Sequence, residues 1–133
     1  MYRITQEIHF CYGHRLLNYN GKCRHLHGHN ARSVITLEGE ELDERGMLID
    51  FTDIKAKLRT WIDEELDHRM ILCKDDPILV TLHEMNEPCY IIDENPTAEN
   101  IARLIYQRAV EFGFPVVEVS LWETPNSQAC YRG

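Results

Sequence analysis

The feature that most constrains the fold is a pair of β-like stretches, residues 2–11 and 31–38, on either side of a histidine-rich segment. In the first stretch apolar and polar side chains alternate, which leaves one apolar face of Tyr2, Ile4, Ile8 and Phe10. A period of two predicts a strand with one buried face. The second stretch is rich in β-branched and apolar residues and predicts a second strand. We expect the two strands to pair antiparallel.

Two helices are predicted further along the chain. Apolar residues recur at helical spacing over about residues 53–66, and Asp50 or Thr52 can cap the N-terminus of this helix. The second helix takes Thr97 as its N-cap and ends at Gly113. Both helices carry one apolar stripe, which indicates that each packs one face against a sheet.

Residues 116–124 alternate again, and residues 128–132 suit a short last strand. Residues 70–95 are harder to assign: residues 75–82 fit a short helix, and residues 89–92 fit either a short strand or an apolar anchor. The expected order is therefore β-β-α-α-β-β. This order indicates an α+β fold, with an antiparallel sheet and helices on one side, in a single domain of 133 residues.

The formal net charge is −8 at pH 7. Nucleic acids and anionic membranes attract basic surfaces, so we expect neither as a partner. No apolar run approaches the roughly 20 residues of a membrane span, and the N-terminus does not resemble a signal peptide. The five cysteines have no spacing typical of a disulfide framework. These features predict a cytoplasmic protein with reduced thiols.

The densest reactive chemistry lies in residues 22–30, Lys-Cys-Arg-His-Leu-His-Gly-His-Asn. His27 and His29 are two residues apart at the mouth of a strand, so both rings can face one metal ion. Catalytic zinc takes about three protein ligands and keeps one position open. His25 or His14 can supply the third ligand. Ligands at i, i+2 and i+4 span roughly 13 Å of extended chain, so geometry favours His14. The competing interpretation is a cluster of surface histidines.

Three further groups are candidates for chemistry. Cys23 is either a fourth zinc ligand or a thiolate base or nucleophile activated by neighbouring cations. The adjacent pair Asp67-His68 suits proton transfer, although such pairs are common by chance. Glu123 lies on an otherwise apolar strand face. A carboxylate in such a place is most often at a strand end in solvent, because its burial without a partner is costly. Beside a pocket, its carboxylate would suit two hydrogen bonds from the N–H groups of a pterin.

Six motifs in order along the chain resemble the 6-pyruvoyl-tetrahydropterin synthase family, and most closely its 6-carboxy-tetrahydropterin synthase branch, which acts in queuosine biosynthesis. They are Gly13-His14-Arg15-Leu16, Cys23-x-x-x-His27-Gly28-His29-Asn30, Ile49-Asp50-Phe51, Leu66-Asp67-His68, Asn95-Pro96-Thr97-Ala98-Glu99-Asn100 and Trp122-Glu123-Thr124. The short spacing between Cys23 and His27 resembles the 6-carboxy branch, whereas a longer insert is typical of the pyruvoyl branch. The segment between the Asp-His pair and Pro96 is longer than in compact members.

The resemblance implies the tunnelling (T) fold, a four-stranded antiparallel sheet with two helices on one face. It also implies homo-oligomeric barrels with active sites between subunits, so that Asp67 and His68 would complete a proton relay with Cys23 across a subunit boundary. The implied substrate is 7,8-dihydroneopterin triphosphate, converted to 6-carboxytetrahydropterin, acetaldehyde and triphosphate. The implied roles are zinc ligands His14, His27 and His29, catalytic residues Cys23, Asp67 and His68, and pterin-binding residues Glu123 and Thr97.

Three alternatives stay open. One is a 6-pyruvoyl-tetrahydropterin synthase, which eliminates triphosphate and keeps the side chain. Another is a non-catalytic zinc- or pterin-binding T-fold module, although such a module needs no proton relay. A zinc hydrolase of unrelated fold would need a carboxylate base by the metal, and none is evident near the motif. Because the chain is acidic, a triphosphate needs local positive charge, for which the candidates besides zinc are Lys22, Arg24, Arg15 and Arg132.

Overall fold

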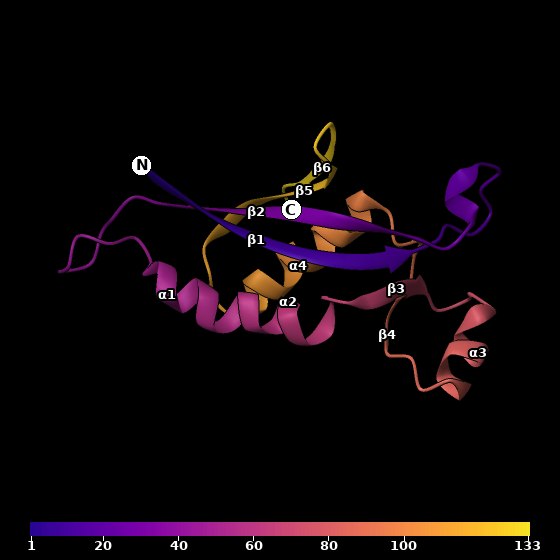
Figure 1. Ribbon diagram of the computed structural model, residues 1–133. Helices are drawn as coiled ribbons and strands as arrows, with labels where there is room; N and C mark the ends of the chain where they lie inside the picture. The colour runs from indigo at the N-terminus through magenta and orange to yellow at the C-terminus, as the bar shows by residue number, and fades with distance from the viewer.

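The computed structural model describes residues 1–133 and contains one six-stranded sheet in the order β4-β3-β1-β2-β5-β6 (Figure 1). The neighbours β1-β2-β5-β6 pair antiparallel, whereas β3 pairs parallel with β1 and β4 pairs parallel with β3. The expected antiparallel four-stranded sheet is therefore present, but two parallel strands extend it. The strands are β1 (Tyr2–His14), β2 (His27–Gly39), β3 (Arg69–Cys73), β4 (Cys89–Ile92), β5 (Val116–Thr124) and β6 (Ser127–Tyr131).

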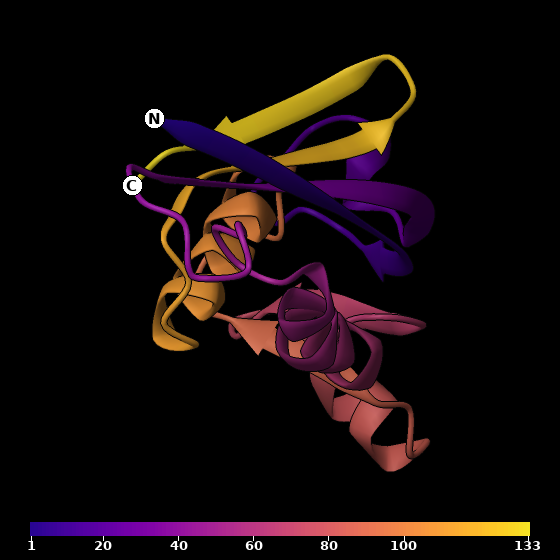
Figure 2. The ribbon, with the colours of Figure 1, turned by 90° about the vertical axis from the view of Figure 1, so that its left-hand side faces the viewer.

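Two helical segments cover the same face of this sheet (Figures 1 and 2). The first runs without a break through α1 (Phe51–Ile54), the π-helical η2 (Lys55–Arg59) and α2 (Thr60–Glu65). Its N-cap is Asp50, whose carboxylate accepts a hydrogen bond from the Thr52 N–H at 2.9 Å. The second is α4 (Ala98–Glu111).

The N-cap of α4 is Thr97, as predicted, and its hydroxyl accepts a hydrogen bond from the Asn100 N–H at 3.2 Å. A third helix, α3 (Ile78–Glu84), lies between β3 and β4, and a single 3₁₀ turn, η1 (Lys22–Arg24), lies between β1 and β2. The predicted order β-β-α-α-β-β is therefore incomplete, because it lacks β3, α3 and β4. None of the helices has both the length and the apolar character that a membrane crossing requires.

The core lies between the helices and one face of the sheet. On β1 the alternate residues Ile8, Phe10 and Tyr12 are buried, and His14 continues the same alternation at only 2% exposure. The helices contribute residues at helical spacing: Ile54, Leu58, Ile62 and Leu66 from the first segment, and Ile101, Ala102, Ile105 and Ala109 from α4. The alternation of β1 that buries its core residues therefore also places His14 at the end of the buried face.

Candidate metal centre and active site

Three histidines meet where β1 ends and β2 begins. The strand register pairs His14 with His27, and it pairs Tyr12 with His29. All three histidine rings lie on the helix-covered face, and their nearest ring nitrogens lie within 4.8 Å of one another. Ring centroids are 4.5 Å apart for His14 and His27, and 5.1 Å apart for each of the other two pairs. The structure therefore brings together the three residues that were predicted as metal ligands.

Each of these rings has a buried Nε2 atom without a hydrogen-bond partner. His14 Nδ1 lies 2.7 Å from the Pro96 carbonyl oxygen, and His27 Nδ1 lies 2.7 Å from the His25 carbonyl oxygen. A carbonyl accepts, so Nδ1 donates its hydrogen and the Nε2 lone pair is free to bind a cation. Buried polar atoms are nearly always paired, so three orphaned nitrogens at one point fit a metal site.

The electrostatics of the site favour neutral rings at His14 and His29. Burial lowers the pKa of His14 despite the opposing effect of its bond to the Pro96 carbonyl, and the neighbouring His27 lowers it further. Burial also lowers the pKa of His29, against the attraction of Glu123. Because a metal ion binds the deprotonated ring, a lowered pKa reduces competition from protons.

His25, the alternative third ligand, is exposed and does not join the cluster. Its ring accepts a hydrogen bond from Arg24 Nε at 3.2 Å, while its carbonyl oxygen orients His27. Gly28 lies opposite Gly13 in the register. A Cβ at Gly28 would lie 3.1 Å from the Tyr12 carbonyl oxygen, so a close approach of the strands favours glycine there.

Glu123, near the end of β5, reaches the histidine cluster. Its Oε1 lies 3.5 Å from the Nε2 atoms of both His14 and His29, and it accepts a hydrogen bond from the Tyr12 hydroxyl at 3.3 Å. Burial, together with the adjacent Glu123 charge, raises the pKa of Tyr12, which therefore stays a neutral donor. Tyr12 was not predicted as a site residue, although its parity with His14 on β1 pointed to it.

Asp67 and His68 form the predicted pair in the turn after α2. His68 Nδ1 lies 2.8 Å from Asp67 Oδ2, and Asp67 Oδ1 accepts a hydrogen bond from the Cys11 backbone N–H at 2.9 Å. Burial raises the pKa of Asp67, but the hydrogen bonds from Cys11 and His68 outweigh burial and leave that pKa below its usual value. Asp67 is thus held as a carboxylate that orients the His68 ring.

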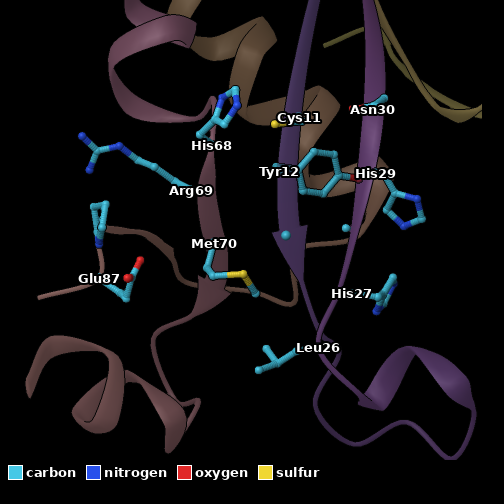
Figure 3. A pocket seen from close by; sticks show the side chains of 13 residues that line it. Cys11, Tyr12, Leu26, His27, His29, Asn30, His68, Arg69, Met70 and Glu87 are labelled. Carbon is cyan, nitrogen blue, oxygen red and sulfur yellow. The ribbon is translucent and has the colours of Figure 1, made fainter. Parts of the chain in front are cut away.

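A cavity of about 590 Å³ lies beside this pair (Figure 3). His68, which is 80% exposed at its side chain, lines it together with Cys11, Arg69, Met70 and Glu87, and the His27–Asn30 stretch of β2 forms another part of the wall. The cavity therefore lies between His68 and the histidine strand β2, whose His27 and His29 rings point away from His68 in Figure 3.

Cys23 lies apart from the Asp-His pair within one chain. It sits half-buried in η1, and its carbonyl oxygen accepts a hydrogen bond from the Leu16 N–H at 2.8 Å. It does not line the cavity and does not group with either set of possible metal ligands. The thiol that the structure places beside Asp67 and His68 is Cys11, which sequence analysis left without a role.

Two of the basic residues considered for the triphosphate are paired with carboxylates. Arg15 binds Asp76 through two N–H groups, and Arg132 binds Glu118 at 2.9 Å. Arg69, which was not considered, lines the cavity and makes no ion pair. Thr97 is half-buried and uses its oxygen to cap α4, directly after the Pro96 carbonyl that orients His14.

Comparisons with known proteins agree with this architecture. The family model described as 6-pyruvoyl tetrahydropterin synthase matches residues 3–133. A protein named 6-carboxy-5,6,7,8-tetrahydropterin synthase from Rickettsia bellii is 38% identical, with 95% of this chain and 96% of the relative covered. The protein of the same name from Haemophilus influenzae is 30% identical, with 99% of both chains covered.

Solved structures give the same result for the fold. The crystal structure of an uncharacterized protein from Wolinella succinogenes superposes with a TM-score of 0.83 at 31% identity, covering 99% of this chain and 98% of that one. The 6-pyruvoyl tetrahydropterin synthase of Caenorhabditis elegans superposes with a TM-score of 0.74 at 22% identity, covering 99% and 95%. The chain described here belongs to the 6-pyruvoyl tetrahydropterin synthase family.

Proposed function

We propose that this protein is a zinc-dependent 6-carboxy-5,6,7,8-tetrahydropterin synthase that converts 7,8-dihydroneopterin triphosphate into 6-carboxytetrahydropterin, acetaldehyde and triphosphate. The observation that carries the proposal is the convergence of three unpartnered Nε2 atoms, from His14, His27 and His29, in a chain of this family. The names of its well-matched relatives support the 6-carboxy branch.

Zinc fits this donor set. Three histidine imidazoles are a common ligand set in catalytic zinc sites, which keep a further position for water or substrate. When bound, zinc acts as a Lewis acid that acidifies the hydroxyl groups of the substrate side chain. The Pro96 and His25 carbonyls hold two of the ligand rings in the tautomer that binds a cation.

The protons are moved by side chains of the protein. Asp67 keeps the hydrogen of His68 on Nδ1, which leaves Nε2 to take up or return a proton in the cavity. Cys23 of the partner subunit acts on the other side of the substrate side chain. The separation of Cys23 from the Asp-His pair within one chain supports this division between subunits.

Glu123 and Thr97 bind the pterin. The Glu123 carboxylate accepts hydrogen bonds from pterin N–H groups, while the Tyr12 hydroxyl fixes its orientation. Thr97 accepts from Asn100, and its own hydroxyl hydrogen is available to the substrate. Arg69, in the cavity wall, supplies positive charge for the triphosphate.

The assembly is a homo-oligomer. β3 pairs with β1 only at Tyr12 and Gly13, so most of the β1 edge lacks a sheet partner, and β6 is the opposite edge of the antiparallel part. Unpaired strand edges favour pairing with another chain. Association at these edges supports an active site built from two subunits.

The test is product analysis after incubation of the zinc-loaded protein with dihydroneopterin triphosphate. We expect one acetaldehyde for each triphosphate released, together with a 6-carboxylated pterin. Triphosphate release without acetaldehyde, and a pterin that keeps its three-carbon side chain, would assign the pyruvoyl reaction instead. Binding of the pterin without turnover would identify a binding module and overturn the enzymatic proposal.

A further inference from the structure

A second set of metal-binding side chains lies outside the histidine cluster. Cys11, Asp67 and His68 each offer one ligand atom, and these three atoms lie within 4.8 Å of one another. Cys11 alternates with Tyr12 on β1, so its side chain is on the opposite face of the strand from the histidines. Figure 3 shows the Cys11 sulfur on the side of β1 that faces His68. The two sets are therefore separate.

Backbone hydrogen bonds hold the second set in place. The Cys11 N–H donates to Asp67 Oδ1 at 2.9 Å, and the His68 N–H donates to the Cys11 carbonyl oxygen at 2.8 Å. These bonds tie the turn after α2 to β1 and fix His68 in its left-handed conformation, at φ 61°. Donor atoms that are already positioned need little reorganisation when a ligand binds.

We propose that Cys11, Asp67 and His68 form a second binding site, for a thiophilic divalent cation such as Zn²⁺, and that occupancy of this site blocks the Asp67-His68 pair. The part concerning the blocked pair rests on the proposed function. A thiolate, an imidazole and a carboxylate are typical ligands of zinc, whereas Mg²⁺ and Ca²⁺ prefer oxygen donors.

The surroundings admit the cation and leave a position open. The Asp67 side chain is 27% exposed and that of His68 80% exposed, and both Cys11 and His68 line the cavity of about 590 Å³. Water or a substrate oxygen can therefore complete the coordination. Of the charged residues in the same wall, Glu87 favours a cation and Arg69 opposes it.

Binding changes the proton balance in a defined way. The Cys11 thiol loses its proton to water, because the thiolate is the ligand. The hydrogen on His68 Nδ1 moves to Nε2, and the 2.8 Å hydrogen bond to Asp67 is replaced by bonds from both groups to the cation. His68 then no longer has a free Nε2 lone pair for proton transfer, so a second equivalent of zinc inhibits the enzyme that the first activates.

The experiment is titration of the metal-stripped protein with Co²⁺, followed by its thiolate-to-cobalt charge-transfer absorption and by equilibrium dialysis. The wild-type protein should bind two equivalents of Co²⁺ and show the thiolate-to-cobalt absorption band. Cys11→Ala should bind one equivalent and lose the band, whereas Cys23→Ala and Cys130→Ala should keep both. His68→Gln should also lose the second equivalent of Co²⁺. Because the His68 ring is exposed, this variant tests the site without the risk that a substitution within strand β1 disturbs folding.

Several results would overturn the second site. One is the binding of only a single equivalent of Co²⁺ by the wild-type protein. Another is a second equivalent of Co²⁺ that Cys11→Ala still binds. The third is loss of the thiolate-to-cobalt absorption band in Cys23→Ala but not in Cys11→Ala. The last result would instead make Cys23 a ligand of the histidine site. Zinc inhibition of turnover is measured separately, with the Cys11→Ala variant as the comparison. If no turnover of the triphosphate occurs at all, the proposed function fails while the cobalt titration still decides the site.

Discussion

His14 and His27 face each other directly across β1 and β2, with their ring centroids 4.5 Å apart. Each donates its Nδ1 hydrogen to a backbone carbonyl, so the strand pairing and the tautomers together prepare the metal site. We predict that His27→Ala lowers zinc affinity by more than the roughly 10–100-fold that loss of an outer hydrogen-bond partner costs. Competition with a chelator measures the affinity.

The matched control is His25→Ala. Its ring is exposed, and only its backbone carbonyl serves His27, so the alanine variant should retain zinc at nearly wild-type affinity. A loss of affinity in His25→Ala equal to that in His27→Ala would contradict the assignment of ligands.

Cys23→Ala should lower turnover without loss of zinc. A positioned proton-transfer group contributes roughly 10²–10⁴-fold to a rate, and we expect a decrease in kcat in that range. Metal analysis of the same sample should give wild-type content. Cys130→Ala, at an exposed residue of β6, is the control. Near wild-type turnover in Cys23→Ala would exclude the thiol from the reaction.

Burial of His14 and His29 should make the metal-free protein sensitive to acid. Both pKa values are lowered in the folded state, chiefly by burial, whereas an unfolded histidine takes up a proton near pH 6.5. Below about pH 6.5 the unfolded state therefore binds more protons, and the free energy of unfolding falls by up to about 1.4 kcal/mol per pH unit for each histidine. The fall ends once the folded-state pKa is passed.

Urea unfolding of the metal-free protein, between about pH 7.5 and pH 5, measures this dependence. His14→Asn, which keeps a side-chain donor for the Pro96 carbonyl, should reduce the slope, and His9→Asn, at an exposed position of β1, should not. An unchanged slope in His14→Asn would show that burial of this ring does not set the pH dependence.

Sequence patterns predicted the antiparallel part of the fold because it depends on local periodicity, whereas the grouping of His14 with His27 and His29 was predicted from ligand geometry and from the family resemblance. Alternation on β1 places Tyr12 and His14 on one face, and the Thr97 N-cap is a local signal. Residues 75–82 fitted the helix α3 and residues 89–92 the strand β4, although neither entered the predicted order. Strand β3 was not predicted, because Ile71 and Leu72 belong to a continuous apolar run, which does not distinguish a strand from a buried helix.

Contacts between segments that are distant in the sequence could not be predicted either. Cys11 and Asp67 are 56 positions apart, and no local pattern joins them. Arg15 was considered for the triphosphate because of its charge, but Asp76, which lies 61 positions later, pairs with it. Long-range pairs of this kind follow from the parallel addition of β3 beside β1, which periodicity alone does not reveal.

Removal of zinc should abolish turnover and preserve the fold. The core is a cluster of 20 buried residues between sheet and helices, and the histidine cluster lies at the end of that face. Chelation should leave the far-ultraviolet circular dichroism and cooperative unfolding intact, while stability falls by about 4 kcal/mol where zinc had been present at about 1,000 times its Kd. Collapse of the dichroism signal would show that the metal is needed for folding.

The Arg15–Asp76 pair should stabilise the protein far more than the exposed ion pairs do. The Asp76 side chain is fully buried, and it also accepts the Ile78 N–H at 2.9 Å at the start of α3. Removal of one partner from a buried pair leaves an unpaired charge, so Arg15→Met should lower the free energy of unfolding by about 3 kcal/mol. Arg45→Met, which breaks an exposed pair with Asp43, should cost less than about 1 kcal/mol.

Acid should reduce this difference. The hydrogen bonds from Arg15 lower the pKa of Asp76, and the Ile78 N–H lowers it further. A carboxyl group with a lowered pKa contributes stability above its unfolded pKa of about 3.9 and loses that contribution as the pH falls through the folded value. Urea unfolding should therefore show the largest difference in the free energy of unfolding between wild type and Arg15→Met near neutral pH, and a smaller difference below about pH 4. A difference that is equal at both pH values would mean that Arg15 stabilises the chain through packing and not through its charge.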